Sequence, residues 1–402
     1  MNSALNSWES LSVGLFTYFF LELLADLGKK IVILYLPGIM AITTWLVMPI
    51  FFYHIYTKSD WQSRLWLKYM PVSSDDYYAF VVPGTLMMIL GMRITLGKLK
   101  VNKNPKQYLE NARTYLKDKP RIGLFLISIG LVSGVLDFLS PASLKQVFYL
   151  MTHLTYVGVF YNMYSPVGKM KGVITASVFT LTIAQALING MFGELIFISA
   201  LSLILILLGK KVSFNRKLAI SVSGLAFIII LQSVKAQYRQ KSWKEGGADP
   251  FYMGQLLLSK IDNPSELMDK DKLFFVAVRL NQGWLIAVTM DRVPRLHPFA
   301  NGETIWQSVA ASLVPRLVWP DKPEAGGHTN LKRFWGFESR GFSMNIGPIG
   351  EAYANFDKTG GIIYMFFYGL FFNLILFKIL KLAEKRPTII LWLPFLFMYT
   401  IT

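Results

Sequence analysis

The chain has 402 residues, of which 53% are hydrophobic and only 16% charged, a balance that excludes an ordinary soluble globular protein. Its formal net charge is +17, and it contains no cysteine, which excludes disulfides, thiolate metal sites and enzymes with a cysteine nucleophile. The lipid bilayer is therefore part of the solvent in which this sequence folds.

About ten apolar segments follow one another along the chain. Each is close to the roughly 20 residues that a helix needs to cross a hydrocarbon core about 30 Å thick. The predicted spans are residues 11–28, 31–56, 78–97, 122–139, 145–164, 172–189, 191–209, 218–236, 361–380 and 388–402. The sequence thus predicts an all-α polytopic integral membrane protein.

The predicted spans divide the chain into three regions. Residues 1–236 would form an N-terminal transmembrane bundle, residues 237–360 a large outer loop with short helices, and residues 361–402 the last two spans. Inside the loop, residues 274–290 are apolar enough to resemble a span, but Arg279 lies near their centre. An unpartnered charge there costs about 3 kcal/mol or more, so we predict an interfacial or re-entrant helix.

The positive charges follow this topology. Residues 98–121 contain eight Lys and Arg, which marks that connection as cytoplasmic. Alternation then places four other short basic connections on the same side, and it places the acidic N-terminus and the large loop outside the cytoplasm. The exception is the connection at residues 57–77, which is basic but falls outside. Because topology explains the charge, we expect no nucleic acid as a partner.

The large loop has residues suited to binding an anion. Six Pro and seven Gly between residues 291 and 356 disfavour long helices and predict turns and short helices. Arg316 stands among apolar neighbours, and its guanidinium fork suits a phosphate, although it could instead reach lipid headgroups or pair with Asp321. Four further cations could converge on the same ligand: Lys235, Arg239, Arg333 and Arg340. For Arg333 a solvated or headgroup-facing position is the alternative.

Two loop residues are candidates for a general base. His328 follows a Gly-Gly pair and could accept a proton, with a structural role as the alternative. Glu351 lies in a glycine-containing stretch that leads into the ninth predicted span, and its alternative role is a polar cap for that helix. The sequence has no HExxH, paired-histidine or GxxxxGK motif, so we expect no metal, nucleotide or other cofactor.

Four stretches in the second half of the chain carry a family resemblance. They are residues 232–239 (QSVKAQYR), 298–304 (PFANGET), 315–323 (PRLVWPDKP) and 350–356 (GEAYANF). With the large late loop, they resemble the bacterial Wzy-type polymerases, which join O-antigen or exopolysaccharide repeat units.

The resemblance implies an enzyme that polymerises oligosaccharides carried on a polyprenyl diphosphate. It would work at the outer face of the bacterial cytoplasmic (inner) membrane, among membrane lipids, with a chain-length regulator and a flippase as further partners. Glu351 or His328 would take the proton of the acceptor hydroxyl. The diphosphate would bind Arg316, Arg340, Lys235, Arg239 and Arg333, and sugar rings would stack on Trp319, Trp335 and Tyr353.

Two other functions remain open from the sequence. A lipid-linked glycan ligase would use the same cations but transfer a finished glycan to a different acceptor. A transporter or flippase would need a polar path through the helices, for which the interior supplies few charges, chiefly Glu22, Asp26, Arg93 and His153.

Overall fold

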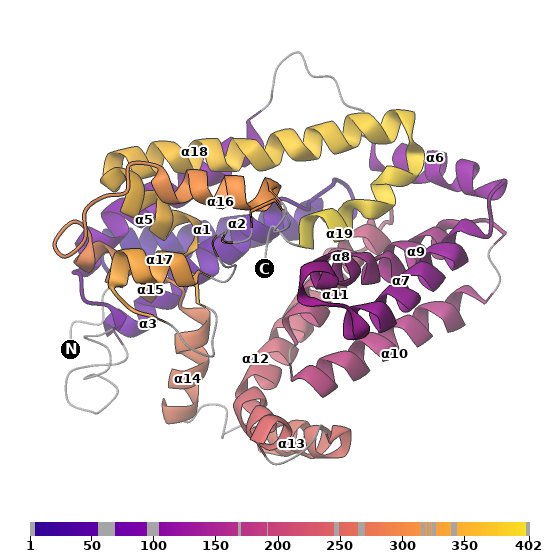
Figure 1. Cartoon of the computed structure of the whole chain (residues 1–402), viewed down its shortest axis with the longest axis horizontal. Coiled ribbons are helices and arrows are strands. Elements are labelled where there is room, and N and C mark those ends of the chain that lie inside the picture. The colour runs from indigo at the N-terminus through magenta and orange to yellow at the C-terminus, as the bar shows by residue number, and fades with distance from the viewer. Residues whose placement is uncertain are drawn as a thin grey trace. The chain divides into compact units, whose positions relative to one another are not determined.

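A computed structural model describes most of the chain, and helices are the regular secondary structure that it shows there. The described residues are 5–54, 69–94, 104–167, 170–190, 192–244, 249–263, 270–314, 318–319, 321, 323, 327–338 and 344–398. No strand forms among them, so the all-α prediction is confirmed for this part of the chain. Figure 1 shows the helices in their chain order. The chain divides into two compact units, each assembled from separate segments.

The first unit combines the N-terminal helices with most of the predicted loop. It comprises residues 1–22, 34–96 and 274–375. Its helices are α1 (Ser7–Asp26), α2 (Tyr35–Ala41), the π-helix η1 (Ile42–Val47), α3 (Met48–His54), α5 (Ser74–Arg93), α14 (Lys270–Leu280), α15 (Gly283–Arg292), α16 (Glu303–Leu313), α17 (His328–Trp335) and α18 (Gly347–Lys385). The last residues of α1 and α18 and the first residues of α14 belong to the second unit.

The second unit contains the middle of the chain and its C-terminal segment. It comprises residues 23–33, 97–273 and 376–402. Its helices are α6 (Pro105–Lys117), α7 (Ile122–Leu139), α8 (Ala142–Thr152), α9 (Leu154–Tyr164), α10 (Lys171–Asn189), α11 (Gly193–Leu207), α12 (Phe214–Lys244), α13 (Pro250–Asp262), the 3-10 helix η3 (Pro387–Trp392) and α19 (Leu393–Met398). These compact units are not the three regions expected from hydropathy. Those regions describe membrane topology, and they stay a prediction.

Five helical stretches in the described part of the chain are long and apolar enough to cross a membrane. They are Tyr35–His54, Ile122–Leu139, Lys171–Ile188, Phe214–Lys235 and Gly347–Lys385. Each overlaps one of the predicted spans. The prediction of a helical membrane protein is confirmed in this form, whereas the count of about ten spans and the outer position of the loop stay predictions.

One predicted span differs from the structure for a local reason. Residues 145–164 form two helices, α8 and α9, separated at His153. The His153 ring Nδ1 lies 3.0 Å from the carbonyl oxygen of Tyr149, the acceptor that the His153 amide would use in a continuous α-helix. The amide instead donates to the carbonyl of Leu150, at 3.3 Å.

Residues 274–290 agree with the prediction that they do not form one continuous span. They lie in α14 and α15, which are separated at Asn281 and Gln282. Asn281 is fully buried in the first unit, and neither helix is long enough to cross a bilayer. The short helices α16 and α17 also fit the turn-rich composition of residues 291–356.

Glycines allow helices to cross closely in both units. In the first unit, a Cβ at Gly369 of α18 would overlap the carbonyl of Met88 in α5, and a Cβ at Gly91 would overlap the carbonyl of Phe366. In the second unit, a Cβ at Gly158 of α9 would lie 2.6 Å from the carbonyl oxygen of Gly123 in α7. Small residues at crossings of this kind allow backbone-to-backbone packing between apolar helices.

The helix α18 consists of two sections that meet at Asp357. This residue has φ 59° and ψ −172°, a conformation in which a residue other than glycine is rare. The chain folds back after the break, as the closeness of Gly361 to Ala352 shows. A Cβ at Gly361 would lie 3.2 Å from the Ala352 backbone. The short first section, residues 347–356, therefore packs against the beginning of the long apolar second section.

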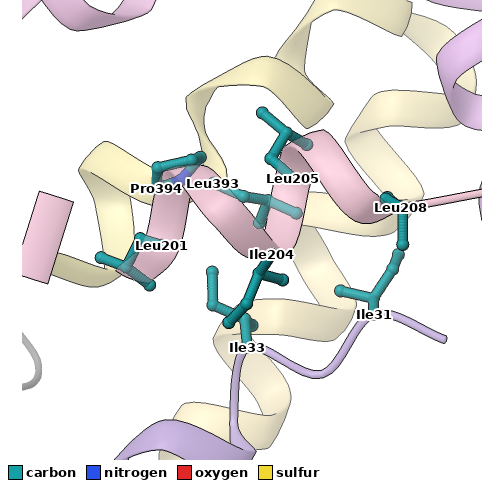
Figure 2. A pocket seen from close by; sticks show the side chains of 8 residues that line it. All are labelled: Ile31, Ile33, Leu201, Ile204, Leu205, Leu208, Leu393 and Pro394. Carbon is teal, nitrogen blue, oxygen red and sulfur yellow. The ribbon is translucent and has the colours of Figure 1, made fainter. Parts of the chain in front are cut away.

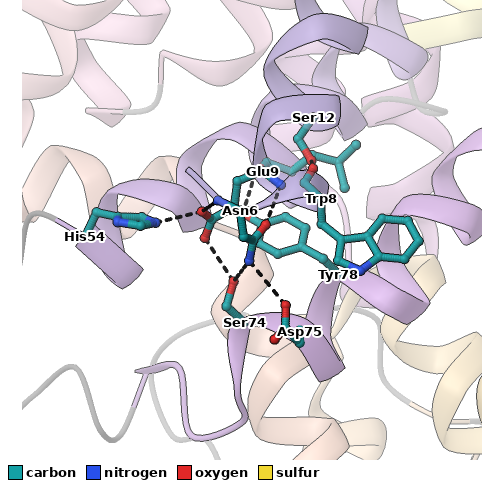
Figure 3. Close-up of polar contacts among 9 residues, drawn as sticks. Asn6, Trp8, Glu9, Ser12, His54, Ser74, Asp75 and Tyr78 are labelled. Atoms are coloured by element: carbon teal, nitrogen blue, oxygen red, sulfur yellow. Dashed lines mark hydrogen bonds and ion pairs between the residues drawn. The ribbon is translucent and has the colours of Figure 1, made fainter. Parts of the chain in front are cut away.

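A buried carboxylate joins the first turn of α1 to α3 and α5 (Figure 3). Glu9 is only 1% exposed. It forms a capping box with Asn6. The backbone amide of Asn6 donates to Glu9 Oε2 at 2.9 Å, and the backbone amide of Glu9 donates to Asn6 Oδ1 at 2.8 Å. The same carboxylate accepts a hydrogen bond from Ser74 Oγ at 2.9 Å and lies 2.7 Å from His54 Nε2.

Replacing Glu9 with Ala should destabilise the first unit. The change removes the Glu9 half of the capping box, whereas the bond from the backbone amide of residue 9 to Asn6 Oδ1 remains. It also removes the charged acceptor of the Ser74 Oγ hydrogen bond and the carboxylate beside His54 Nε2; a hydrogen bond to a charged group contributes roughly 1.5–3 kcal/mol. We expect a lower midpoint of thermal unfolding in detergent. Glu110→Ala is the matched control, because this glutamate is exposed on α6. Equal midpoints for the two variants would contradict a structural role for Glu9.

Candidate functional site

Two of the stretches that carry the family resemblance pack against each other in the first unit. The Ala300 amide donates to the carbonyl of Ala354 at 3.0 Å, and the Asn301 amide donates to the carbonyl of Asn355 at 3.1 Å. These carbonyls lie at the end of the first section of α18. The break at Asp357 ends the helical hydrogen bonding there, so residues 300 and 301 supply the donors.

The side chain of Asn355 fixes the start of α16 onto α18. It is 1% exposed, and its Nδ2 donates to Thr304 Oγ1 and to the Glu351 carbonyl, both at 2.8 Å. Its Oδ1 accepts a hydrogen bond from the Gly302 amide at 2.9 Å. All polar atoms of this amide therefore have partners, which makes Asn355 a rigid support for its surroundings.

Glu351 points into this polar junction. Its carboxylate interacts with the side chains of Thr304, in the first turn of α16, and Asn330, on α17. Its Oε1 is buried and has no hydrogen-bond partner among the described residues. We call Glu351, Thr304, Asn330 and Asn355 the Glu351 cluster. A buried carboxylate oxygen without a partner is unusual and marks a place where a ligand or water could bind.

Cationic side chains of α17 lie close to this cluster. Arg333 follows Asn330 by three residues, so the two share a face of the helix. Arg333 Nη2 lies 3.5 Å from Glu303 Oε2, while its Nε is buried without a hydrogen-bond partner in the described part of the chain. Lys332 Nζ lies 2.6 Å from Glu338 Oε1, and this contact lowers the pKa of Glu338. Arg333 therefore has a buried donor, Nε, that an anion could engage.

The remaining candidates of the first unit lie in or near segments outside the described residues. Arg316 and Arg340 fall on such segments, so their roles stay predictions. Trp319 is half-buried in a short described stretch between them. His328 is the first residue of α17 and is half-buried, and its role as a base also stays a prediction.

The two cations of the 232–239 stretch belong to α12 in the second unit. Arg239 Nε donates to the carbonyl of Gly190 at 2.7 Å, which caps the end of α10. Lys235 is half-buried on the same helix. The contribution of these two residues to diphosphate binding beside Arg316 stays a prediction.

Two aromatic residues that we expected to stack on sugars have packing roles. Trp335 is 8% exposed, and its indole Nε1 donates to Thr289 Oγ1 at 3.0 Å. Tyr353 is 5% exposed, and its hydroxyl donates to the carbonyl of Val293 at 3.1 Å. Their rings lie in the core and their polar atoms have internal partners, and a contact of either ring with a sugar stays a prediction.

The interior charges noted in the sequence are paired within each unit. In the first unit, Arg93 Nη1 lies 2.8 Å from Glu22 Oε2. In the second unit, His153 Nε2 lies 3.2 Å from Glu194 Oε1. Such pairing is how apolar helices accommodate ionisable side chains.

A small cavity in the second unit is entirely apolar (Figure 2). Its walls are Ile31, Ile33, Leu201, Ile204, Leu205, Leu208, Leu393 and Pro394. The side chains that line it carry no polar atom.

Comparison with known protein families assigns the chain to one of them. A model described as "Domain of unknown function (DUF8712)" matches residues 38–385, which is most of the sequence. The chain belongs to this family. The DUF8712 region includes every residue of the Glu351 cluster, whereas Glu9 lies before it. No curated protein and no solved structure matches this DUF8712 protein.

Sequence reasoning missed three members of the Glu351 cluster in the DUF8712 protein. Thr304 and Asn355 lie in two of the stretches noted for their resemblance, and Asn355 follows Glu351 by one helical turn. That spacing could have suggested a shared face. Asn330 has no comparable signal, because its contact with Glu351 depends on how α17 packs.

Proposed function

We propose that the protein polymerises oligosaccharide repeat units carried on a polyprenyl diphosphate, at the outer face of the bacterial cytoplasmic membrane. The proposal includes about ten membrane spans and a large loop on the outer side. Its main support is the Glu351 cluster, where residues 298–304 and 350–356 pack together around a carboxylate with a buried, unpartnered oxygen. Both stretches resemble Wzy-type polymerases.

The proposed reaction needs a base and a set of cations. An acceptor hydroxyl forms a bond to the anomeric carbon of the donor while the bond between that carbon and the diphosphate oxygen breaks. Glu351 takes the hydroxyl proton, and His328 is the alternative base. The departing lipid diphosphate gains negative charge, which Arg316, Arg340 and Arg333 neutralise.

A reconstitution assay tests this function directly. The protein is placed in lipid nanodiscs with a polyprenyl-diphosphate-linked repeat unit from its host, and the products are separated on a glycan gel. We expect a ladder of chain lengths without added nucleotide or metal, and loss of the ladder in Arg316→Ala. Full-length polymer from Arg316→Lys would argue against bidentate binding of the diphosphate.

The same assay separates the alternatives. A single transfer of the glycan to a different acceptor, without a ladder, would indicate a ligase. If the substrate stays unchanged both alone and with a second candidate acceptor added, glycan transfer would be contradicted and transport favoured.

A further inference from the structure

The helix α16 carries an exposed apolar stripe. Trp306, Val309 and Leu313 are 71%, 45% and 77% exposed, respectively. Their spacing of three and four residues places them on one face of the helix. Thr304 lies on the opposite side, is 3% exposed and is bonded to Asn355. One face of α16 is thus fixed to the Glu351 cluster, and the other has no partner in the described chain.

A second exposed apolar stripe lies on the long section of α18. Ile363, Phe367 and Phe371 are 52%, 58% and 56% exposed, and their spacing of four residues also places them on one face. This section belongs to a helix long and apolar enough to cross a membrane. Its stripe is the kind of surface that lipid chains cover in a spanning helix.

The start of α16 lies next to the start of the long section of α18. Thr304, in the first turn of α16, is bonded to Asn355, two residues before the break at Asp357 where the long section of α18 starts. In the view of Figure 1 the two helices run in similar directions. If the long section of α18 enters the bilayer, α16 enters beside it.

We infer that α16 dips into the bilayer and that lipid hydrocarbon covers its Trp306, Val309 and Leu313 face. At 1.5 Å per residue, the eleven residues of α16 extend about 16 Å, roughly half of a hydrocarbon core about 30 Å thick. Trp306 lies near the start of the helix, at the depth where Trp is enriched in membrane proteins. Leu313 lies at its far end. This inference concerns lipid contact and does not depend on the proposed chemistry.

Spin labelling tests this inference without an activity assay. Since the chain has no cysteine, Trp306→Cys, Val309→Cys and Leu313→Cys each introduce a single labelling site. In nanodiscs, collisions of the label with oxygen report lipid, and collisions with a water-soluble nickel chelate report solvent. Thr329→Cys is the reference, because Thr329 is exposed on the polar helix α17.

We expect the ratio of oxygen to nickel collisions to rise from position 306 to position 313, and to exceed the ratio at position 329 several-fold. Free access of nickel to all four positions would place α16 in water and overturn the inference. Exclusion of both reagents from the three stripe positions would mean that protein covers this face, which would overturn it equally. Because three positions are labelled independently, misfolding of one variant leaves the test intact.

Discussion

The variant Glu351→Gln should lose polymerisation while it keeps its fold. Glutamine has nearly the same shape and can still contact Thr304 and Asn330, but it cannot take the proton of an acceptor hydroxyl. Removing a general base slows reactions by roughly 100-fold to 10,000-fold. The reconstituted protein should therefore give no visible ladder in the time in which the unmodified protein completes one.

Glu338→Gln is the matched control for Glu351→Gln. Glu338 is an exposed carboxylate that pairs with Lys332, outside the Glu351 cluster. This variant should produce a normal ladder. Glu351→Asp retains a carboxylate at a shorter reach and should restore part of the activity. A normal ladder from Glu351→Gln would exclude Glu351 as the base and direct attention to His328.

The variant Gly369→Ala should lower the stability of the first unit markedly. A Cβ at this position would overlap the carbonyl of Met88, so α5 and α18 would have to separate. Forcing extra volume into a well-packed contact costs about 1–3 kcal/mol, and backbone atoms cannot move aside as a side chain can. The midpoint of thermal unfolding in detergent, followed by circular dichroism, should fall.

The chain offers a matched control for this change. Gly224 on α12 would place a Cβ in open space, with no atom within 4 Å. Gly224→Ala should leave the midpoint unchanged or raise it, since alanine favours a helix by up to about 1 kcal/mol over glycine. If Gly369→Ala and Gly224→Ala gave the same midpoint, close packing of α5 against α18 would be contradicted.

Hydropathy predicted the helical class because apolar residues must either be buried or face lipid, and both situations leave long apolar runs in the sequence. The same reasoning predicted that Arg279 prevents a continuous span at residues 274–290. It did not predict the interruption at His153, because side chains that compete for the carbonyl of Tyr149 leave no trace in hydropathy. Thr152 Oγ1 donates to this carbonyl at 2.7 Å, and the His153 ring Nδ1 lies 3.0 Å from it. Local polar competition of this kind needs coordinates.

The candidate site was only partly accessible from the sequence. Glu351 was a candidate because a carboxylate in an apolar, glycine-containing stretch needs a reason to be there. Its partners Thr304 and Asn330 lie 47 and 21 residues earlier in the chain. Only packing brings them together, and packing also explains why Trp335 and Tyr353 are buried although their residue types suggested sugar binding.

The fold-back at Asp357 has a further consequence for how this chain could meet a lipid-anchored molecule. Glu351 precedes Asp357 by six residues of rigid helix, which is about 9 Å, and that short section packs against the apolar section that follows. This apolar section is long enough to cross a membrane. If it does so, backbone geometry sets the height of Glu351 relative to the hydrocarbon, and a molecule held in the same bilayer by its own lipid would reach it at one fixed level.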